Sequence, residues 1–167
     1  QYRKEIDGLR AIAVLSVIFY HAHLVKSGFW LFSGGYIGVD IFFVISGYLI
    51  TSIILKELEE DSFSFYNFYD RRARRILPAL LFVLIASMIG AYFYLLPHSF
   101  INYTKSLLSS VYFVSNIFWL TQDSYNAESS IYQPLLHTWS LAVEEQYYIL
   151  FPIILLLVVR YARKYIG

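Results

Sequence analysis

Ionisable side chains lie inside stretches of this chain that are otherwise almost entirely apolar. They are His21, His23, Asp40, Glu144 and Glu145. A charge buried in hydrocarbon is costly, so such residues mark functional sites by default. An imidazole exchanges protons near neutral pH, and a neighbouring carboxylate can orient it. These residue types therefore indicate acid–base chemistry or a proton pathway inside a membrane.

Arg10 and His21 are eleven residues apart in the first apolar stretch. In a helix this spacing is about three turns and ~16 Å, so both side chains lie on one face. That face would reach from the cytoplasmic boundary into the outer half of the bilayer. The spacing also fits an arginine that only anchors the helix and a histidine that only packs against other helices.

Asp40 follows Gly38 at the start of the second apolar stretch, which is expected to run inward from the outer surface. Its depth should therefore be close to that of His21. A carboxylate at this depth could orient the imidazole and raise its basicity. Asp40 could instead only cap the helix that begins after Gly38.

Glu144 and Glu145 lie at the start of the last apolar stretch, just after a segment that holds His137, Trp139 and Ser140. Adjacent helical residues point about 100° apart, so at most one glutamate faces a given pocket squarely. One of them could instead pair with an arginine in a purely structural contact.

A cluster of four arginines precedes the third apolar stretch. It consists of Arg71, Arg72, Arg74 and Arg75. Residues three and four apart share a helix face, and guanidinium groups grip phosphate oxygens in pairs. The cluster therefore suits a phosphorylated carrier or a nucleotide-like donor. It could also serve only topology and lipid headgroup anchoring.

The elements that must position these groups are membrane helices. Of the 167 residues 58% are hydrophobic and only 15% are charged, against about a quarter in soluble domains. Four stretches have spanning length, and a fifth, Ile101–Leu120, is rich in Ser and Asn and predicts a weak or re-entrant segment. The four clear spans are roughly Leu9–Val25, Gly38–Leu55, Ile76–Leu96 and Leu141–Val159. The predicted fold is an all-α, polytopic transmembrane helix bundle.

Basic residues predict the orientation of this bundle. Arg3, Lys4 and Arg10 flank the first span, and the arginine cluster lies in the second loop. The positive-inside rule places the N-terminus and this loop in the cytoplasm. The basic tail, with Arg160, Arg163 and Lys164, agrees if four stretches cross and Ile101–Leu120 does not. We therefore expect a multi-pass protein of the cell's inner (plasma) membrane.

Aromatic residues gather just before the arginine cluster. They are Phe63, Phe65, Tyr66, Phe68 and Tyr69. Aromatic side chains followed by basic ones suit a helix at the level of the lipid headgroups. Pro78 can begin a new helix without losing a needed hydrogen bond. The pattern predicts an interfacial helix before Pro78.

Composition excludes several classes of function. The chain has no cysteine, which excludes disulfides, thiolate catalysis and zinc–thiolate centres. Its formal net charge of +1 gives no basic field for a nucleic acid. We expect no bound metal and no nucleic-acid partner.

Four motifs occur in an order that resembles a known family. Ile6–Ala11 followed by His21 resembles that family's Arg-x10-His pattern, and Gly38–Ile50 resembles its second-span motif. Phe68–Pro78 is similar to its cytoplasmic arginine motif, and His137–Tyr148 to its Trp-Ser-Leu…Glu motif. The family is that of the integral-membrane acyltransferases (acyltransferase family 3), which O-acylate bacterial surface polysaccharides, peptidoglycan and related glycans.

This resemblance implies transfer of an acyl group, expected to be acetyl, from cytoplasmic acyl-CoA to a glycan hydroxyl. It implies no permanently bound cofactor, with acetyl-CoA or another acyl-CoA as co-substrate and membrane lipid around the helices. The implied donor-binding residues are Arg10, Arg71, Arg72, Arg74 and Arg75. The catalytic candidates are His21, Asp40, Glu144 and Glu145. Ser46, His137, Trp139 and Ser140 are expected to line the acceptor site or the transfer path.

The resemblance covers only part of the family's membrane domain, which has about twice as many membrane residues. Residues 1–167 are therefore expected to be a partial transmembrane acyltransferase domain, with further spans or an extracytoplasmic domain downstream. The segment alone could be inactive. A transporter or proton relay would use the same buried ionisable residues, and a membrane scaffold would need none of them.

Overall fold

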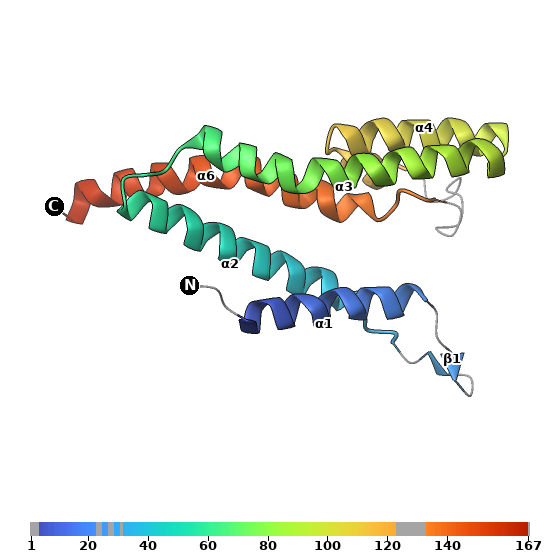
Figure 1. Ribbon diagram of the computed structural model, residues 1–167, viewed down its shortest axis with the longest axis horizontal. Helices are drawn as coiled ribbons and strands as arrows, with labels where there is room; N and C mark the ends of the chain where they lie inside the picture. The colour runs from blue at the N-terminus through green and yellow to red at the C-terminus, as the bar shows by residue number, and fades with distance from the viewer. Residues whose placement is uncertain (1–3, 23–24, 27–28, 31, 123–132, 167) are drawn as a thin grey trace. The chain divides into compact units, whose positions relative to one another are not determined.

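The computed structural model describes residues 4–22, 25–26, 29–30, 32–122 and 133–166, and most of them are helical (Figure 1). The helices are α1 (Lys4–His21), α2 (Ile37–Glu59), α3 (Phe65–Tyr94), α4 (Pro97–Val111), α5 (Ser115–Leu120) and α6 (Thr138–Ile166). Between α1 and α2, the two-residue strands β1 (Val25–Lys26) and β2 (Phe29–Trp30) pair antiparallel. The predicted all-α class is confirmed. Arg3 and His23 lie outside the described residues.

The chain divides into two compact units, Gln1–Asp61 and Ser62–Gly167. In the first unit, α1 and α2 pack side by side along glycine contacts (Figure 1). The Cα of Gly38 lies directly against the carbonyl of Ala13, and Gly35 lies against the carbonyl of Ser16. Small residues let two helix backbones approach this closely in a membrane. No larger side chain fits at either glycine unless the helices move apart.

The second unit begins with α3, which is continuous from Phe65 to Tyr94. Ser64 caps its N-terminus, where its Oγ accepts a hydrogen bond from the backbone N–H of Asn67. Pro78 lies inside the helix, so the prediction that a new helix begins there is wrong. A proline lacks the backbone N–H, so the helix loses one hydrogen bond at Pro78. The long apolar sequence after Pro78 still favours a helix in lipid, and α3 continues.

The weak segment Ile101–Leu120 is divided into two short helices. A turn after Val111 gives Phe113 a positive φ of 53°. There the N–H of Val114 bonds the carbonyl of Ser109, and the N–H of Phe113 bonds that of Ser110. This pattern is a Schellman motif, which ends a helix. With 15 residues, α4 is about 22 Å long, short of the ~30 Å hydrocarbon core.

Side chains from α3, α4 and the turn before α6 form the core of the second unit. Its buried members are Leu80, Leu84, Ala91, Tyr103 and Leu135. Polar side chains next to it are paired: Tyr103 Oη lies 2.8 Å from Ser87 Oγ, and Ser110 Oγ lies 2.8 Å from Thr138 Oγ1. Hydrogen bonds inside the unit thus account for three serines of the weak segment, Ser106, Ser109 and Ser110. The Oγ of Ser115 is buried and has no hydrogen-bond partner among the described residues.

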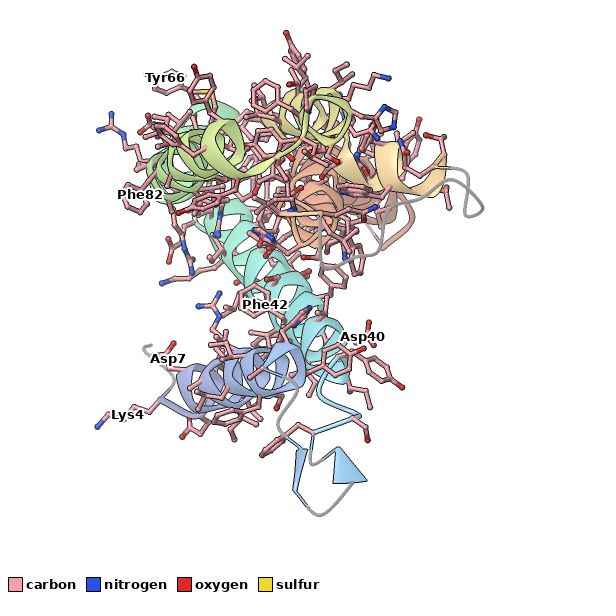
Figure 2. The ribbon with its side chains drawn as sticks, turned by 90° about the vertical axis from the view of Figure 1, so that its right-hand side faces the viewer. Lys4, Asp7, Asp40, Phe42, Tyr66 and Phe82 are labelled. Atoms are coloured by element: carbon pink, nitrogen blue, oxygen red, sulfur yellow. The ribbon has the colours of Figure 1, made fainter. Side chains whose placement is uncertain are left out.

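Among the residues that the structure describes, three helices are long and apolar enough to cross a membrane: α2, α3 and the part Thr138–Tyr161 of α6. Their outward faces are apolar. Tyr66 and Phe82 of α3, which are 78% and 74% exposed, are examples, and Figure 2 shows both side chains projecting from the helix. Lipid can cover such faces, whereas water would not favour them. The chain is therefore part of a membrane protein.

The predicted first span, Leu9–Val25, differs from the helix that forms. α1 ends at His21, and the backbone of Val25 pairs with Trp30 in the hairpin. The first turns of α1 carry Lys4, Glu5 and Asp7, and only the part after Arg10 lacks Lys, Arg, Asp and Glu. By length and composition this helix is the weakest of the four predicted spans.

Candidate functional site

The predicted site residues fall into two groups, one in each unit. Arg10, His21, Asp40 and Ser46 belong to the α1–α2 unit. The arginine cluster and the segment from His137 to Glu145 belong to the α3–α6 unit. Each group is described by itself.

His21 is the last residue of α1, and its ring is held by its own helix. The imidazole Nδ1 lies 2.9 Å from the backbone carbonyl oxygen of Val17. A carbonyl can only accept a hydrogen bond, so Nδ1 must carry the proton that is donated. In the neutral ring this leaves Nε2 with the basic lone pair. The side chain of His21 is exposed, so Nε2 is open to a reactant.

Asp40 lies in the first turn of α2, where the positive end of the helix dipole stabilises a negative charge. Its side chain is exposed, and Figure 2 shows it projecting from α2. Within the described part of this unit, no ion pair joins Asp40 to His21. The carbonyl of Val17 thus orients the imidazole here, and a role for Asp40 in that task stays a prediction. Ser46, in the same helix, is buried.

Arg10 lies half-buried between α1 and α2. Its guanidinium carbon is 5.8 Å from the centre of the Phe42 ring, a cation–π distance. Figure 2 labels Phe42 on the part of α2 that packs against α1. The Nε of Arg10 is buried and has no hydrogen-bond partner among the described residues. Arg10 and His21 share one continuous helix, so their spacing of about three turns holds.

The four clustered arginines of α3 have different surroundings. The Nε of Arg74 donates to both carboxylate oxygens of Asp70, at 3.0 and 2.8 Å. Arg71 and Arg75 are exposed. Arg72 is half-buried, and its guanidinium carbon lies 5.7 Å from the Phe68 ring centre and 5.3 Å from that of Tyr148. Only Arg72 of the four therefore belongs to the packed interior of its unit.

The two glutamates of α6 also differ. The Tyr148 hydroxyl donates a hydrogen bond to Glu144 Oε1, one turn away on the same helix. The Oε1 of Glu145 is buried and has no hydrogen-bond partner in the part of the chain that the structure describes. Glu145 lies within electrostatic range of both Glu144 and Arg72. The guanidinium of α3 and the two carboxylates of α6 thus form one charged cluster.

His137, Trp139 and Ser140 surround the first turn of α6. The Ser140 hydroxyl donates to the carbonyl oxygen of His137 at 3.1 Å, and both His137 and Trp139 are exposed. Thr138 between them is buried and binds Ser110 of α4. This bond holds the start of α6 against α4, and it thereby fixes the backbone from which the exposed side chains of His137 and Trp139 project.

Sequence reasoning missed three residues that hold the α6 end of the site. Tyr148 binds Glu144 and packs on Arg72, and Gln146 and Asn116 exchange two side-chain hydrogen bonds of 3.0 Å. Gln146 also donates to the Phe113 carbonyl at 2.9 Å. The i, i+4 spacing of Glu144 and Tyr148 was a usable signal. No sequence signal pairs Asn116 with a residue thirty positions away.

Binding chemistry at these groups favours an anionic ligand. The exposed guanidinium groups of Arg71 and Arg75 can donate hydrogen bonds to phosphate oxygens. No group of three or more His, Cys, Asp or Glu side chains suited to a metal ion occurs among the residues that the structure describes.

Comparison with known proteins gives the same assignment as the four motifs. A family model described as "Acyltransferase domain" matches residues 3–167. "Putative O-acetyltransferase SAS0844" of Staphylococcus aureus strain MSSA476 is 44% identical over 156 residues, which are 93% of this chain and 25% of that protein. "O-acetyltransferase OatA" of Staphylococcus aureus strain NCTC 8325 is 39% identical over the same fractions.

The chain therefore spans about a quarter of the length of these curated relatives. No solved structure matches it. Since the family model covers nearly all of its residues, the chain belongs to the acyltransferase family that this domain defines.

Proposed function

We propose that this chain is part of a membrane-bound O-acyltransferase. The enzyme moves an acyl group, expected to be acetyl, from cytoplasmic acyl-CoA to a hydroxyl of a cell-surface glycan or its precursor. The observation that carries this proposal is the open Nε2 of His21, in a chain whose relatives are named O-acetyltransferases. Base chemistry at a hydroxyl is what O-acyl transfer requires.

In the proposed reaction, Nε2 of His21 takes the proton of the acceptor hydroxyl as its oxygen attacks the thioester carbonyl carbon. A C–O bond forms, the C–S bond breaks, and the proton passes from the imidazolium to the departing CoA thiolate. A positioned general base typically contributes about 10²- to 10⁴-fold in rate. The bond from Nδ1 to Val17 supports this role because it fixes the ring in the tautomer that the step needs.

The donor is proposed to bind at the arginine cluster. Arg71 and Arg75 are exposed and suit the phosphates of CoA. Arg10 is proposed to take part in binding the donor as well. Asp40, Glu144 and Glu145 are proposed as further catalytic residues, and Ser46, His137, Trp139 and Ser140 as residues of the acceptor path.

The proposed topology has four crossings, by α1, α2, α3 and α6, with the N-terminus in the cytoplasm of the inner membrane. At about 45 Å, the 30-residue α3 exceeds the ~30 Å hydrocarbon core. Its first three turns, with the aromatic residues and the arginines, can therefore lie at the cytoplasmic headgroups. α4 and α5 are proposed not to cross.

Because this chain is a quarter of its relatives' length, the remaining spans are proposed to complete the site. Glycan acceptor specificity would reside in those spans or in an extracytoplasmic domain.

The test is His21→Ala in the full-length membrane protein, with acyl-CoA-dependent glycan O-acylation as the readout. Loss of the base is expected to lower the rate by about 10²-fold or more. His98→Ala is the matched control, because His98 is exposed in α4 and has no proposed role. A wild-type rate in the His21 variant would refute the assignment.

A further inference from the structure

Tyr148 contacts both charged elements of the α3–α6 unit. Its hydroxyl donates to Glu144 Oε1, and its ring centre lies 5.3 Å from the guanidinium carbon of Arg72. Only 5% of the Tyr148 surface is exposed, so these contacts are made in the interior of the unit. One aromatic side chain thus joins the arginine cluster of α3 to the glutamate pair of α6.

Two aromatic rings contact the Arg72 guanidinium, which also lies within electrostatic range of Glu144. It contacts Phe68 of its own helix and Tyr148 of α6, at 5.7 and 5.3 Å from the ring centres. Cation–π contacts strengthen when the cation is shielded from water, and they restrict the guanidinium more than a mobile surface ion pair does. The Tyr148 ring is therefore one of the two contacts that position this cation, and it is the one that comes from α6.

The hydroxyl of Tyr148 has a different task from its ring. A phenol O–H that donates to a carboxylate stabilises the charge on that carboxylate and fixes its direction. Glu145, the next residue, has a buried oxygen with no such donor among the described residues. The Tyr148 hydroxyl therefore gives Glu144 a hydrogen bond that the neighbouring Glu145 Oε1 lacks among the described residues.

We propose that Tyr148 is a positioning residue of the acyltransferase site, whose hydroxyl holds the Glu144 carboxylate for the transfer step while its ring seats Arg72. This inference rests on the proposed function and assigns Tyr148 a part in it. Its hydroxyl acts through Glu144 on the chemical step. Its ring acts through Arg72 on the arrangement of the donor-binding helix.

Tyr148→Phe separates the two tasks because phenylalanine keeps the ring and loses the hydroxyl. Loss of a hydrogen bond to a charged group predicts a kcat about ten- to a hundredfold lower. The KM for acetyl-CoA is expected to stay within about twofold because the contact with Arg72 remains. Tyr161→Phe is the control, since Tyr161 lies on the same helix and is 63% exposed. Both variants are compared at equal amounts of membrane-inserted protein.

A double variant tests whether Tyr148 acts through Glu144. In the Glu144→Gln background, Tyr148→Phe is expected to change kcat by less than about twofold, because the charged acceptor is already gone. Independent, multiplicative losses in kcat would overturn the inference. A wild-type kcat for Tyr148→Phe, or a change in KM alone, would also overturn it. If the wild-type protein transfers no acyl group, the proposed function fails, and this inference fails with it.

Discussion

The two units hold their candidate residues in different ways. In the α1–α2 unit the helices meet through glycine and backbone, while His21 and Asp40 lie exposed at the helix ends. In the α3–α6 unit Arg72, Glu144 and Glu145 lie half-buried, and the side chains of Arg72 and Tyr148 pack against each other. In the first unit the candidate residues are therefore positioned by two helices whose backbones touch. In the second unit they are positioned by contacts between side chains.

This difference indicates which changes each unit can tolerate. A backbone contact leaves no space for any added atom, so a small substitution there affects the whole helix pair. A network of side chains can lose one member and keep its helices in place, but it leaves the former partners unsatisfied. The following predictions test the contrast, from the largest expected effect to the smallest.

Gly38→Val is expected to have the largest effect on stability. A Cβ at this position would overlap the carbonyl of Ala13 and lie 2.9 Å from Val17 Cγ2. Overpacking against backbone should lower the free energy of unfolding by about 3 kcal/mol or more. Thermal unfolding of the full-length protein in detergent measures this loss.

Two glycines provide controls for Gly38. A Cβ at Gly8 in α1, or at Gly90 in α3, would meet nothing within 4 Å. Gly8→Ala and Gly90→Ala should be neutral or stabilise their helices by up to about 1 kcal/mol. If Gly38→Val behaved like these controls, the close approach of α1 and α2 would be disproved.

Gln146→Leu should have an intermediate effect. It removes the bonds to Asn116 and to the Phe113 carbonyl, which accepts at the turn where φ is positive. Unsatisfied buried polar groups cost about 1–3 kcal/mol each, so a loss of about 2–3 kcal/mol is expected in denaturant titration. Adding Asn116→Leu should recover part of the lost stability, because no unpaired amide of Asn116 then remains. A double variant as unstable as the sum of the single ones would contradict the amide pair.

Arg74→Ala should have the smallest effect. The Arg74 side chain is 79% exposed, and a surface ion pair such as that with Asp70 contributes less than about 1 kcal/mol. Arg72→Ala is the comparison, because it removes both ring contacts and should lower the melting temperature clearly further. Equal shifts for the two variants would show that Arg72 is no more part of the interior than Arg74 is.

The sequence by itself determined the helical class, the membrane class and the family. Apolar runs of spanning length appear as α2, α3 and α6 because backbone hydrogen bonds in lipid must be satisfied within the helix. The four motifs were readable because each is a short, local pattern. Even the face shared by Arg10 and His21 follows from spacing in a single helix.

Only the tertiary structure decided which members of each motif are exposed, paired or buried. The arginine cluster consists of four residues of one type, and the sequence does not distinguish them. Only Arg72 of the four packs between rings from two helices. The division of Ile101–Leu120 depends on a turn that Gln146 of another helix stabilises. Burial and side-chain pairing are set by neighbours far away along the chain, and a local pattern carries no record of those neighbours.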